Sequence, residues 1–452
     1  PQAAPPQQIA PPPVYVAPVM ADPTNDALLA SLQEEINKIK KEIKKPDTKN
    51  KWGTARVGGR LFFDSVNIAD QNEESKAADG DINNDLGLRE LFLSAAGEGF
   101  DCFSYKVELA FSARDEVNLS DCYVDTKNVP LFNTLRVGHF KVENGFAYVG
   151  AGTTTTLMEP TGPASSFHTG RRLGISSQQY FWDKRARWMF GFFESRAINN
   201  SRYNINDYQG WMFNTRLTMA PIMEREGERI FHIGASWLYA EPGHRDKTGA
   251  RQAQSFSYLP GAFTHLDVGS PLQMSMDTCR YNKVGAEFII QRGAFGFDGE
   301  MYAIAFNGDK GLPGGEQDRT AYGGYLEMRY FLTGDYRTYD TGTGTLGAVK
   351  MNRNFHTLKV GDYNLIDGFG AFEIVGQWNF VDLTDWRDLN GTSPYGTTIN
   401  AGLQNDFTLG LNWFWNPNVR WILEYVHSTR DIAGHADTLD CDIVAASFRL
   451  HF

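Results

Sequence analysis

Apolar and polar residues alternate along the C-terminal part of the chain. Between Phe407 and Trp413 every second residue is apolar, and Thr408 and Asn412 are among the residues between them. A period of two is the repeat of a β-strand with one apolar face. A tight-turn sequence, Asn-Pro-Asn at 416–418, follows, and the chain then returns with the same alternation. The pattern predicts a hairpin.

One more alternating segment ends the chain, and its apolar face includes Phe448, Leu450 and the last residue, Phe452. Aromatic-rich alternation with tight turns on one side and longer loops on the other is typical of a transmembrane β-barrel. A terminal Phe after alternating apolar residues also resembles the signal read by the outer-membrane barrel assembly machinery. We therefore assign these three residues to an assembly signal.

The same alternation continues through the rest of the chain from Trp52 onward. It predicts about sixteen strands: the first includes 57–63, and the others lie near 86–97, 101–113, 117–126, 133–144, 171–181, 185–197, 208–220, 229–240, 278–291, 294–307, 319–334, 367–382, 404–416, 418–430 and 439–452. Bacterial single-chain barrels have an even number of strands. About sixteen strands leave a water-filled lumen. The predicted fold class is all-β, a transmembrane antiparallel barrel spanning 52–452.

The composition fits a barrel better than a helical membrane protein. The chain has 452 residues and 42% hydrophobic residues, and its mean hydropathy is −0.39. No run of about 18 or more apolar residues exists. Aromatic residues make up 13% of the chain, and there are 45 glycines, as interfacial girdles and strand bends require. An array of soluble β-sandwiches is the alternative.

Two segments precede the strands. Residues 1–23 are rich in Pro, Gln and Ala and should form an extended tether, or a recognition site for the cell wall. The chain starts at Pro1 without Met, so we expect that a secretory signal has been removed. Residues 24–46 carry an apolar heptad pattern, made of Leu29, Leu32, Ile36, Ile39 and Ile43. Ile at both core positions favours a coiled-coil neck of more than two strands; a lone amphipathic helix is the alternative.

Three C-terminal blocks resemble the phosphate-selective porin O and P family: YFLTGDYRTYD from Tyr330, GAFEIVGQWNFVDL at 370–383 and LGLNWFWNPNVRWILEYVHS at 409–428. LRVGHFKVENGF at 135–146 and TGRRLGI at 169–175 resemble the family's middle blocks. The resemblance implies a homotrimeric outer-membrane porin that passes small hydrophilic solutes. It also implies that residues 145–170, 241–276 and 335–366 fold inward and narrow the pore.

Strand parity places the short turns and the N-terminus in the periplasm and the long loops outside, except 335–366, which falls on the periplasmic side. Alternation assigns a set of basic residues to the lumen: Arg56, Arg60, Lys106, Arg187, Arg216, Arg329, Arg420 and Arg449. It also assigns acidic residues inward: Glu108, Asp298, Glu300, Glu327, Glu373 and Glu424. These charges either brace the wall as ion pairs or, where unpaired, guide anions.

The family's basic pore residues match further positions here, namely Lys141, Arg171, Arg172, Arg337, Lys350, Arg353 and Lys359. Loop 145–170 departs from the family, because it contains no Arg or Lys. We therefore expect a modest anion preference without tight phosphate binding, despite a net charge of −11. The alternative function is a structural barrel that anchors the cell wall through its N-terminal extension.

Catalysis is not expected. The chain has no GxSxG, HExxH or P-loop motif, and its four cysteines have no zinc-site spacing, so free thiols or long-range pairing are expected. The segment 79–90 falls near calcium-loop spacing, but Asn84 stands where Gly is needed, which favours an acidic, solvated turn. We expect no cofactor and no nucleic-acid partner; the expected partners are outer-membrane lipid, two further copies of the chain and small anions.

Overall fold

A computed structural model describes residues 53–99, 102–111, 117–195, 210–241, 253–263, 266, 268, 271–308, 318–360, 363–389, 391–392 and 398–452, together with Glu34. Residues 54–452 form one compact unit. The predicted Pro-rich extension and coiled-coil neck lie outside the described residues, apart from Glu34.

Sixteen of the described strands close into one antiparallel barrel, as the sequence predicts. They are β1 (Arg56–Gln71), β2 (Asp85–Gly99), β3 (Phe103–Phe111), β4 (Val117–Val129), β5 (Asn133–Lys141), β6 (Arg171–Phe181), β7 (Ala186–Glu194), β8 (Trp211–Glu224), β9 (Arg229–Glu241), β11 (Leu272–Arg292), β12 (Phe295–Gly308), β13 (Arg319–Phe331), β18 (Ala371–Asp382), β21 (Gly402–Asn416), β22 (Val419–Ile432) and β23 (Leu439–His451).

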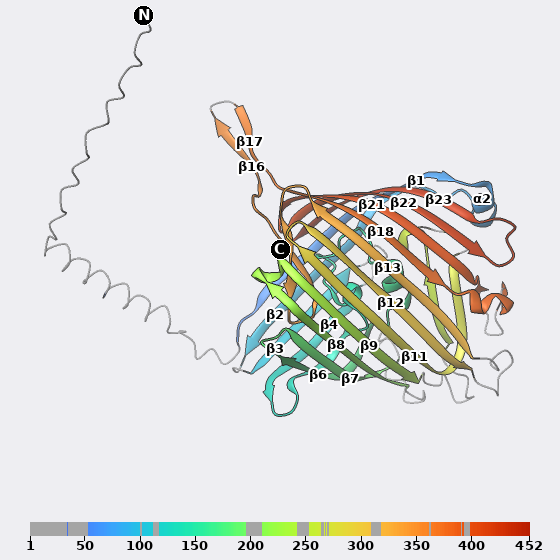
Figure 1. The fold of residues 1–452 in the computed structure, drawn as a ribbon, viewed down its shortest axis with the longest axis horizontal. Helices are drawn as coiled ribbons and strands as arrows, with labels where there is room; N and C mark the ends of the chain where they lie inside the picture. Colours follow the sequence, from blue (N-terminus) through green and yellow to red (C-terminus); the bar gives the residue numbers. More distant parts are fainter. Residues whose placement is uncertain are drawn as a thin grey trace, which may run out of the picture. The chain divides into compact units, whose positions relative to one another are not determined.

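The first and last strands close the barrel. Arg60 of β1 lies opposite Phe92 of β2 on one side and opposite His451 of β23 on the other. Every neighbouring pair between them is antiparallel, and the strands run at a steep tilt (Figure 1). Closure leaves no exposed sheet edge, which is the condition for a sheet within a bilayer.

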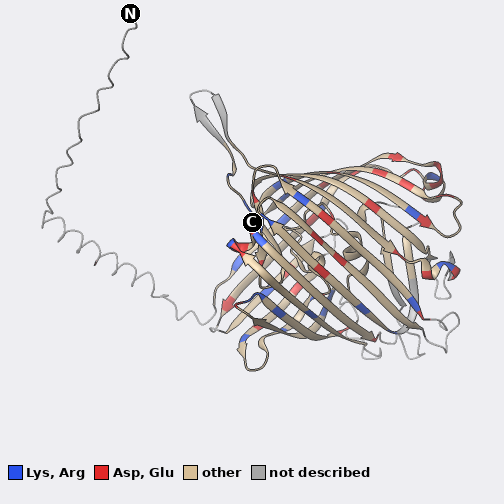
Figure 2. Ribbon diagram, in the orientation of Figure 1, with Lys and Arg blue, Asp and Glu red and all other residues tan. Residues whose placement is uncertain are grey.

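The side chains alternate as the sequence pattern requires. On β22, Trp421 and Leu423 are 41% and 51% exposed on the outer wall, whereas Arg420 and Glu424 are 4% and 3% exposed on the inner one. An apolar outer wall around a polar interior is the reverse of a soluble core and fits contact with lipid. Figure 2 shows acidic and basic residues along the strands as well as at their ends. None of the described helices is long and apolar enough to cross a membrane.

The two ends of the barrel differ. Short turns join β2 to β3, β4 to β5, β6 to β7, β8 to β9, β11 to β12 and β21 to β22, and we call this the short-turn end. Near it, rings of Trp413, Trp415, Trp421 and Phe448 contact one another on the wall, as in an interfacial aromatic girdle. The opposite end, with the longer connections, is the long-loop end.

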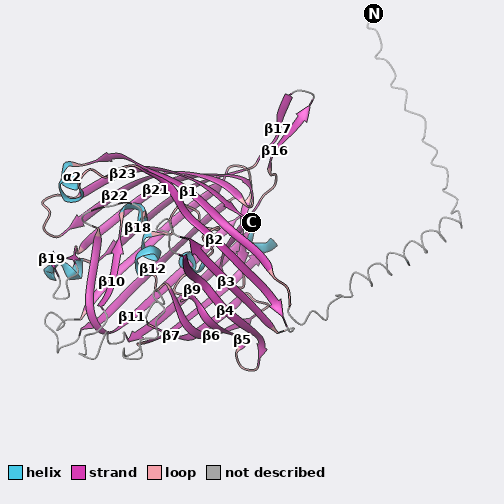
Figure 3. Ribbon diagram, turned by 180° about the vertical axis from the view of Figure 1, so that it is seen from behind, coloured by secondary structure: helices cyan, strands magenta, loops and turns pink. Residues whose placement is uncertain are grey.

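Several short elements lie inside the barrel. They are α3 (Phe146–Val149), α4 (Gly162–Phe167), β10 (Ala253–Tyr258), η2 (Pro260–Ala262) and the hairpin of β14 (Tyr336–Asp340) and β15 (Thr345–Lys350). Helix α4 contacts β10, β13 and β18, and Figure 3 shows the short helices among the strands. These elements belong to the three segments that the family resemblance assigns to the interior.

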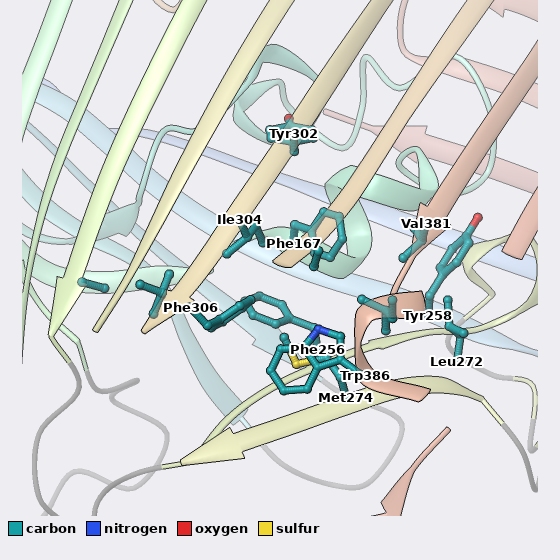
Figure 4. Packing of buried hydrophobic residues seen from close by; sticks show 14 of the residues in the cluster. Phe167, Phe256, Tyr258, Leu272, Met274, Tyr302, Ile304, Phe306, Val381 and Trp386 are labelled. Atoms are coloured by element: carbon teal, nitrogen blue, oxygen red, sulfur yellow. The ribbon is translucent and has the colours of Figure 1, made fainter. Parts of the chain in front are cut away.

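An aromatic cluster fills the lumen along β11, β12 and β18. Phe256 of β10 meets Phe167 of α4 with ring centroids 5.7 Å apart and Phe306 of β12 at 5.9 Å. Trp386 of η3 (Thr384–Leu389) meets Phe306 at 5.4 Å (Figure 4). The Tyr258 hydroxyl donates to Asp406 and holds β10 against the wall.

Residues 335–366 depart in part from the expectation that the whole segment folds inward. The β14–β15 hairpin does, but β16 (Phe355–Val360) and β17 (Tyr363–Phe369) pair only with each other. At the base of this second hairpin, the Phe355 ring stacks on Trp415 of the aromatic girdle with centroids 5.3 Å apart. The Trp413 indole donates to the Phe369 carbonyl at 2.7 Å. The base therefore lies on the outer wall, because Trp413 is outward-facing.

The acidic segment after β1 forms a short helix, α2 (Glu73–Asp79). Two short strands, β19 (Gly391–Thr392) and β20 (Thr398–Ile399), pair with each other. Asp79 pairs with the buried Arg430. Within the described part of the chain no three His, Cys, Asp or Glu side chains gather as a metal site. Cys102, Cys122 and Cys441 are free thiols; the Cys279 side chain lies outside the described residues.

Candidate functional site

Loop 145–170 crosses the lumen, and arginines of the wall and of the β14–β15 hairpin bond to it. Arg420 donates to the Thr155 carbonyl at 2.6 Å. Arg337 donates to the Thr154 carbonyl at 2.9 Å, and Arg449 to the Thr155 hydroxyl at 3.0 Å. Carbonyl oxygens in a buried loop need donors, and these arginines supply them. Guanidinium groups predicted to face water therefore bind the protein's own loop.

Wall carboxylates complete the docking of this loop. Glu424 accepts a hydrogen bond from the Met158 amide at 3.0 Å, and Glu327 accepts one from the Thr156 hydroxyl at 2.6 Å. The loop carries no Arg or Lys, so the wall provides nearly all the charge in these contacts. Because both donors and acceptors of loop 145–170 are hydrogen-bonded to its surroundings, the loop forms a fixed constriction of the lumen.

The β14–β15 hairpin is fixed from the short-turn side. Arg216 donates to the carbonyls of Thr343 and Gly344 at 2.7 and 2.9 Å. The Tyr339 hydroxyl lies 2.7 Å from Nδ1 of His232 on β9. The hairpin thus bonds to wall strands β8 and β9 at its turn and along its first strand.

Further arginines form ion pairs that leave them almost no contact with water. Arg187 pairs with Glu143 at 2.6 Å, and Arg216 pairs with Glu287 at 2.6 Å. Arg187, Arg216, Arg329 and Arg337 are each at most 1% exposed. They face inward as predicted. Contrary to the expectation, however, they do not line the open cavities of the pore. They brace the wall and the hairpin instead.

Open space remains beside strands β1 to β6. A cavity of about 260 Å³ is bounded by this wall, by the first part of loop 145–170 and by the turn of the β14–β15 hairpin. Its basic lining residues are Arg60, Lys106, Arg136, Lys141 and Arg171, and its acidic ones are Glu108, Asp121, Glu143 and Asp340. A second cavity of about 340 Å³ shares Lys106 and Tyr123 with the first and includes Arg56 nearer the short-turn end. The two cavities therefore adjoin along this wall.

Charged side chains on this wall form one chain of ion pairs. Asp121 lies 2.8 Å from Lys106 and 2.6 Å from Arg171. Glu108 lies 3.1 Å from Lys106 and 3.5 Å from Arg60. The three basic side chains keep 15–28% exposure. Unlike the buried arginines, they can meet a passing ion.

Lys141 differs from its neighbours, because no carboxylate pairs with it among the described residues. Its ammonium donates to the carbonyls of Tyr148 and Gly150 at 2.7 and 2.9 Å. Burial raises the pKa of the Tyr148 phenol to about 12, so that group is neutral near pH 7 and supplies no counter-charge. Lys141 is therefore a basic side chain at the cavity that has only backbone carbonyls as hydrogen-bond partners.

The remaining predicted pore residues lie apart from the cavity. The Arg172 Nε donates a hydrogen bond to the Ser195 carbonyl oxygen at 3.0 Å. Lys350 is 57% exposed and pairs with Glu226 at the short-turn end, and Arg353 is exposed between β15 and β16. The Lys359 side chain lies outside the described residues. These placements correct the expectation for Arg172, Lys350 and Arg353.

Sequence reasoning missed Arg136, Asp121 and Asp340. Arg136 lies between Leu135 and Val137, and the latter is 50% exposed on the outer wall. The alternation therefore contained the signal that Arg136 faces inward, where it pairs with Asp125 at 2.7 Å. Asp340 had no comparable signal, because its position depends on how the hairpin folds.

The C-terminal residue closes the wall at the short-turn end. The Phe452 amide donates to the Gly59 carbonyl and the Gly59 amide donates to the Phe452 carbonyl, both at 3.0 Å. The Phe452 ring is 65% exposed and lies against Gly59, where a Cβ would come 2.8 Å from the ring. The predicted neck residues lie outside the described residues, and their role stays a prediction.

Comparisons with known proteins agree with this architecture. The family model described as phosphate-selective porin O and P matches residues 65–452. A curated protein of Caulobacter vibrioides, named as an uncharacterized protein, is 25% identical over 334 residues, which is 69% of this chain and 64% of that protein. The chain thus matches less than two thirds of that relative's length.

Solved structures share the fold at low identity. OprB of Pseudomonas putida, solved at high pH, has 8% identity and a TM-score of 0.51, with 88% of this chain and 94% of that chain covered. OmpF of Salmonella typhi has 11% identity and a TM-score of 0.47, with 89% and 99% covered. The likeness to OprB supports the barrel fold alone.

Proposed function

Because the chain belongs to the phosphate-selective porin O and P family, we propose that its barrel is a passive outer-membrane channel for small hydrophilic solutes with a modest preference for anions. The observation that carries the proposal is the pair of adjoining cavities inside a closed barrel with an apolar outer wall. Water in such a lumen gives ions a path that the bilayer denies them.

The anion preference rests on the balance of charge at the first cavity. Its lining holds five basic side chains against four acidic ones, and most of them neutralise one another in ion pairs. Exposed acidic residues outside the lumen contribute little, because the Debye length is about 8 Å in physiological salt. A small local excess of positive charge supports a weak preference. The absence of basic residues from loop 145–170 argues against tight phosphate binding.

We further propose that three copies assemble, with the short-turn end and the N-terminus in the periplasm. The heptad of residues 29–43 supports this assembly, because tethering to three barrels raises the local concentration of a short coiled coil. Outer-membrane lipid would cover the remaining apolar wall.

Planar-bilayer conductance tests the proposal. The purified full chain should give discrete conductance steps in KCl, and millimolar phosphate should leave the chloride current largely unblocked. A barrel that inserts but conducts nothing would overturn the channel, and would favour the structural barrel that tethers the cell wall through residues 1–23. Strong block by millimolar phosphate would overturn the weak anion preference and indicate a tight site.

A further inference from the structure

Two ionisable side chains at the first cavity, one basic and one acidic, have no ion-pair partner among the described residues. One is the Lys141 ammonium on the wall. The other is the Asp340 carboxylate on the β14–β15 hairpin, which is exposed and lines the same cavity. The other charged lining residues are in ion pairs: Arg136 with Asp125, Glu143 with Arg187, and the rest in the Asp121 and Glu108 chain.

Both groups keep unused hydrogen-bonding capacity. The Lys141 ammonium has three N–H donors and donates two of them to the carbonyls of Tyr148 and Gly150. The Asp340 carboxylate accepts from the Gly342 amide at 2.8 Å and from the Thr343 hydroxyl at 2.7 Å. Its two oxygens offer about four acceptor positions, so about two stay open. A solute can therefore bond to each group without displacing a protein contact.

Neither group moves freely. Lys141 lies at the end of β5 and is held by loop 145–170. Asp340 lies at the hairpin turn, which Arg216 holds through the Thr343 and Gly344 carbonyls. A cation and an anion on different rigid elements of one cavity form a fixed local field.

We propose that this cavity favours small zwitterions, solutes that carry an ammonium and a carboxylate at once, such as α-amino acids. The carboxylate of the solute meets Lys141 and its ammonium meets Asp340. A cavity of about 260 Å³ is large enough for a solute of a few heavy atoms. The inference rests on the proposed channel function and names a solute class for it.

Liposome swelling with the full-length protein separates this selectivity from size. The rate in isosmotic glycine is divided by the rate in glycolamide, which has nearly the same size and no charge. The wild-type ratio should exceed one. Asp340→Asn and Lys141→Gln should each lower the ratio about threefold, because each removes one of the two attractions. Asp340→Glu and Lys141→Arg should keep it, since they retain the charges.

Asp183→Asn is the matched control, because it removes one exposed carboxylate at a short turn away from the cavity. Reversal potentials provide a second readout: Asp340→Asn should shift selectivity toward anions and Lys141→Gln toward cations. Equal ratios in the wild type and both charge-removing variants would overturn the zwitterion site, even if the channel conducts and prefers anions. An equal fall in Asp183→Asn would also overturn it. No swelling with either solute would instead contradict the channel function itself.

Discussion

Arg337 and Glu373 form a two-point ion pair inside the barrel, with Nε 2.9 Å from Oε1 and Nη2 2.6 Å from Oε2. The same guanidinium donates to the Thr154 carbonyl, and the same carboxylate accepts from Asn412 at 3.0 Å. One contact thus joins the β14–β15 hairpin, the wall strands β18 and β21, and loop 145–170. The Arg337–Glu373 pair therefore holds loop 145–170 and the β14–β15 hairpin together.

Removing Arg337 should loosen both segments. Arg337→Ala leaves Glu373 as an unpaired buried charge, a change that costs about 3–5 kcal/mol. We expect a lower unfolding temperature in detergent and larger, noisier conductance steps. Lys350→Ala on the same hairpin is the control, because the Lys350–Glu226 pair is exposed and contributes little. If the two variants behaved alike, the pair would not fix the constriction.

Arg171 and Arg172 are neighbours in sequence with different surroundings. Arg171 lines the cavity and pairs with Asp121, whereas Arg172 bonds to the Ser195 carbonyl. Arg171→Ser should therefore lower the anion-to-cation permeability ratio about two- to threefold, and Arg172→Ser should change it much less. Salt-gradient reversal potentials of the two variants check this order. The reverse order would place the selective charge outside the cavity described here.

Phe452 should matter more for insertion than for stability. Its backbone closes β1 through Gly59, but its ring is largely exposed. Deletion of Phe452 should accumulate unassembled chain in the periplasm, while Phe452→Tyr, which keeps an aromatic ring, should assemble normally. Cell fractionation measures both. Membrane insertion of the deleted chain at the normal level and rate would refute an assembly signal.

The heptad of residues 29–43 should steady a trimer. Replacing Ile36 and Ile39 with Asp places charges in the predicted coiled-coil seam, so trimers should dissociate at a lower temperature in detergent. Asp at the neighbouring non-heptad positions Asn37 and Lys40 is the control. An unchanged dissociation temperature in the seam variant would show that the barrel walls alone hold the trimer.

The strands followed from the sequence because their signal is local. Alternation placed all sixteen barrel strands, and it oriented Arg420 and Glu424 inward, where both are buried. The arrangement inside the lumen is not local. Arg420 bonds to Thr155, 265 positions away, and no periodic pattern relates two such residues.

The same limit explains the errors at the candidate site. Arg187 and Arg216 face inward, but Glu143 and Glu287 bury them, and the sequence does not show which carboxylate each one meets. Lys350 ends β15 and Arg353 follows the hairpin. Both lie apart from the cavity, because only the turn and the strand ends beside it line the cavity. Asp340 gains its position from that turn, so it was missed.

The sign of the reversal potential in a KCl gradient tests the central claim most directly. The account predicts a modest anion preference, because Lys141 and the ion-paired Arg60, Lys106 and Arg171 lie on the conducting cavity, while the surplus of acidic residues in the chain as a whole is screened by salt. The measurement uses the wild-type full chain in neutral lipid, so that lipid charge does not bias the result. A small potential of the sign set by chloride is the predicted result. A potential of the sign set by potassium would contradict the account.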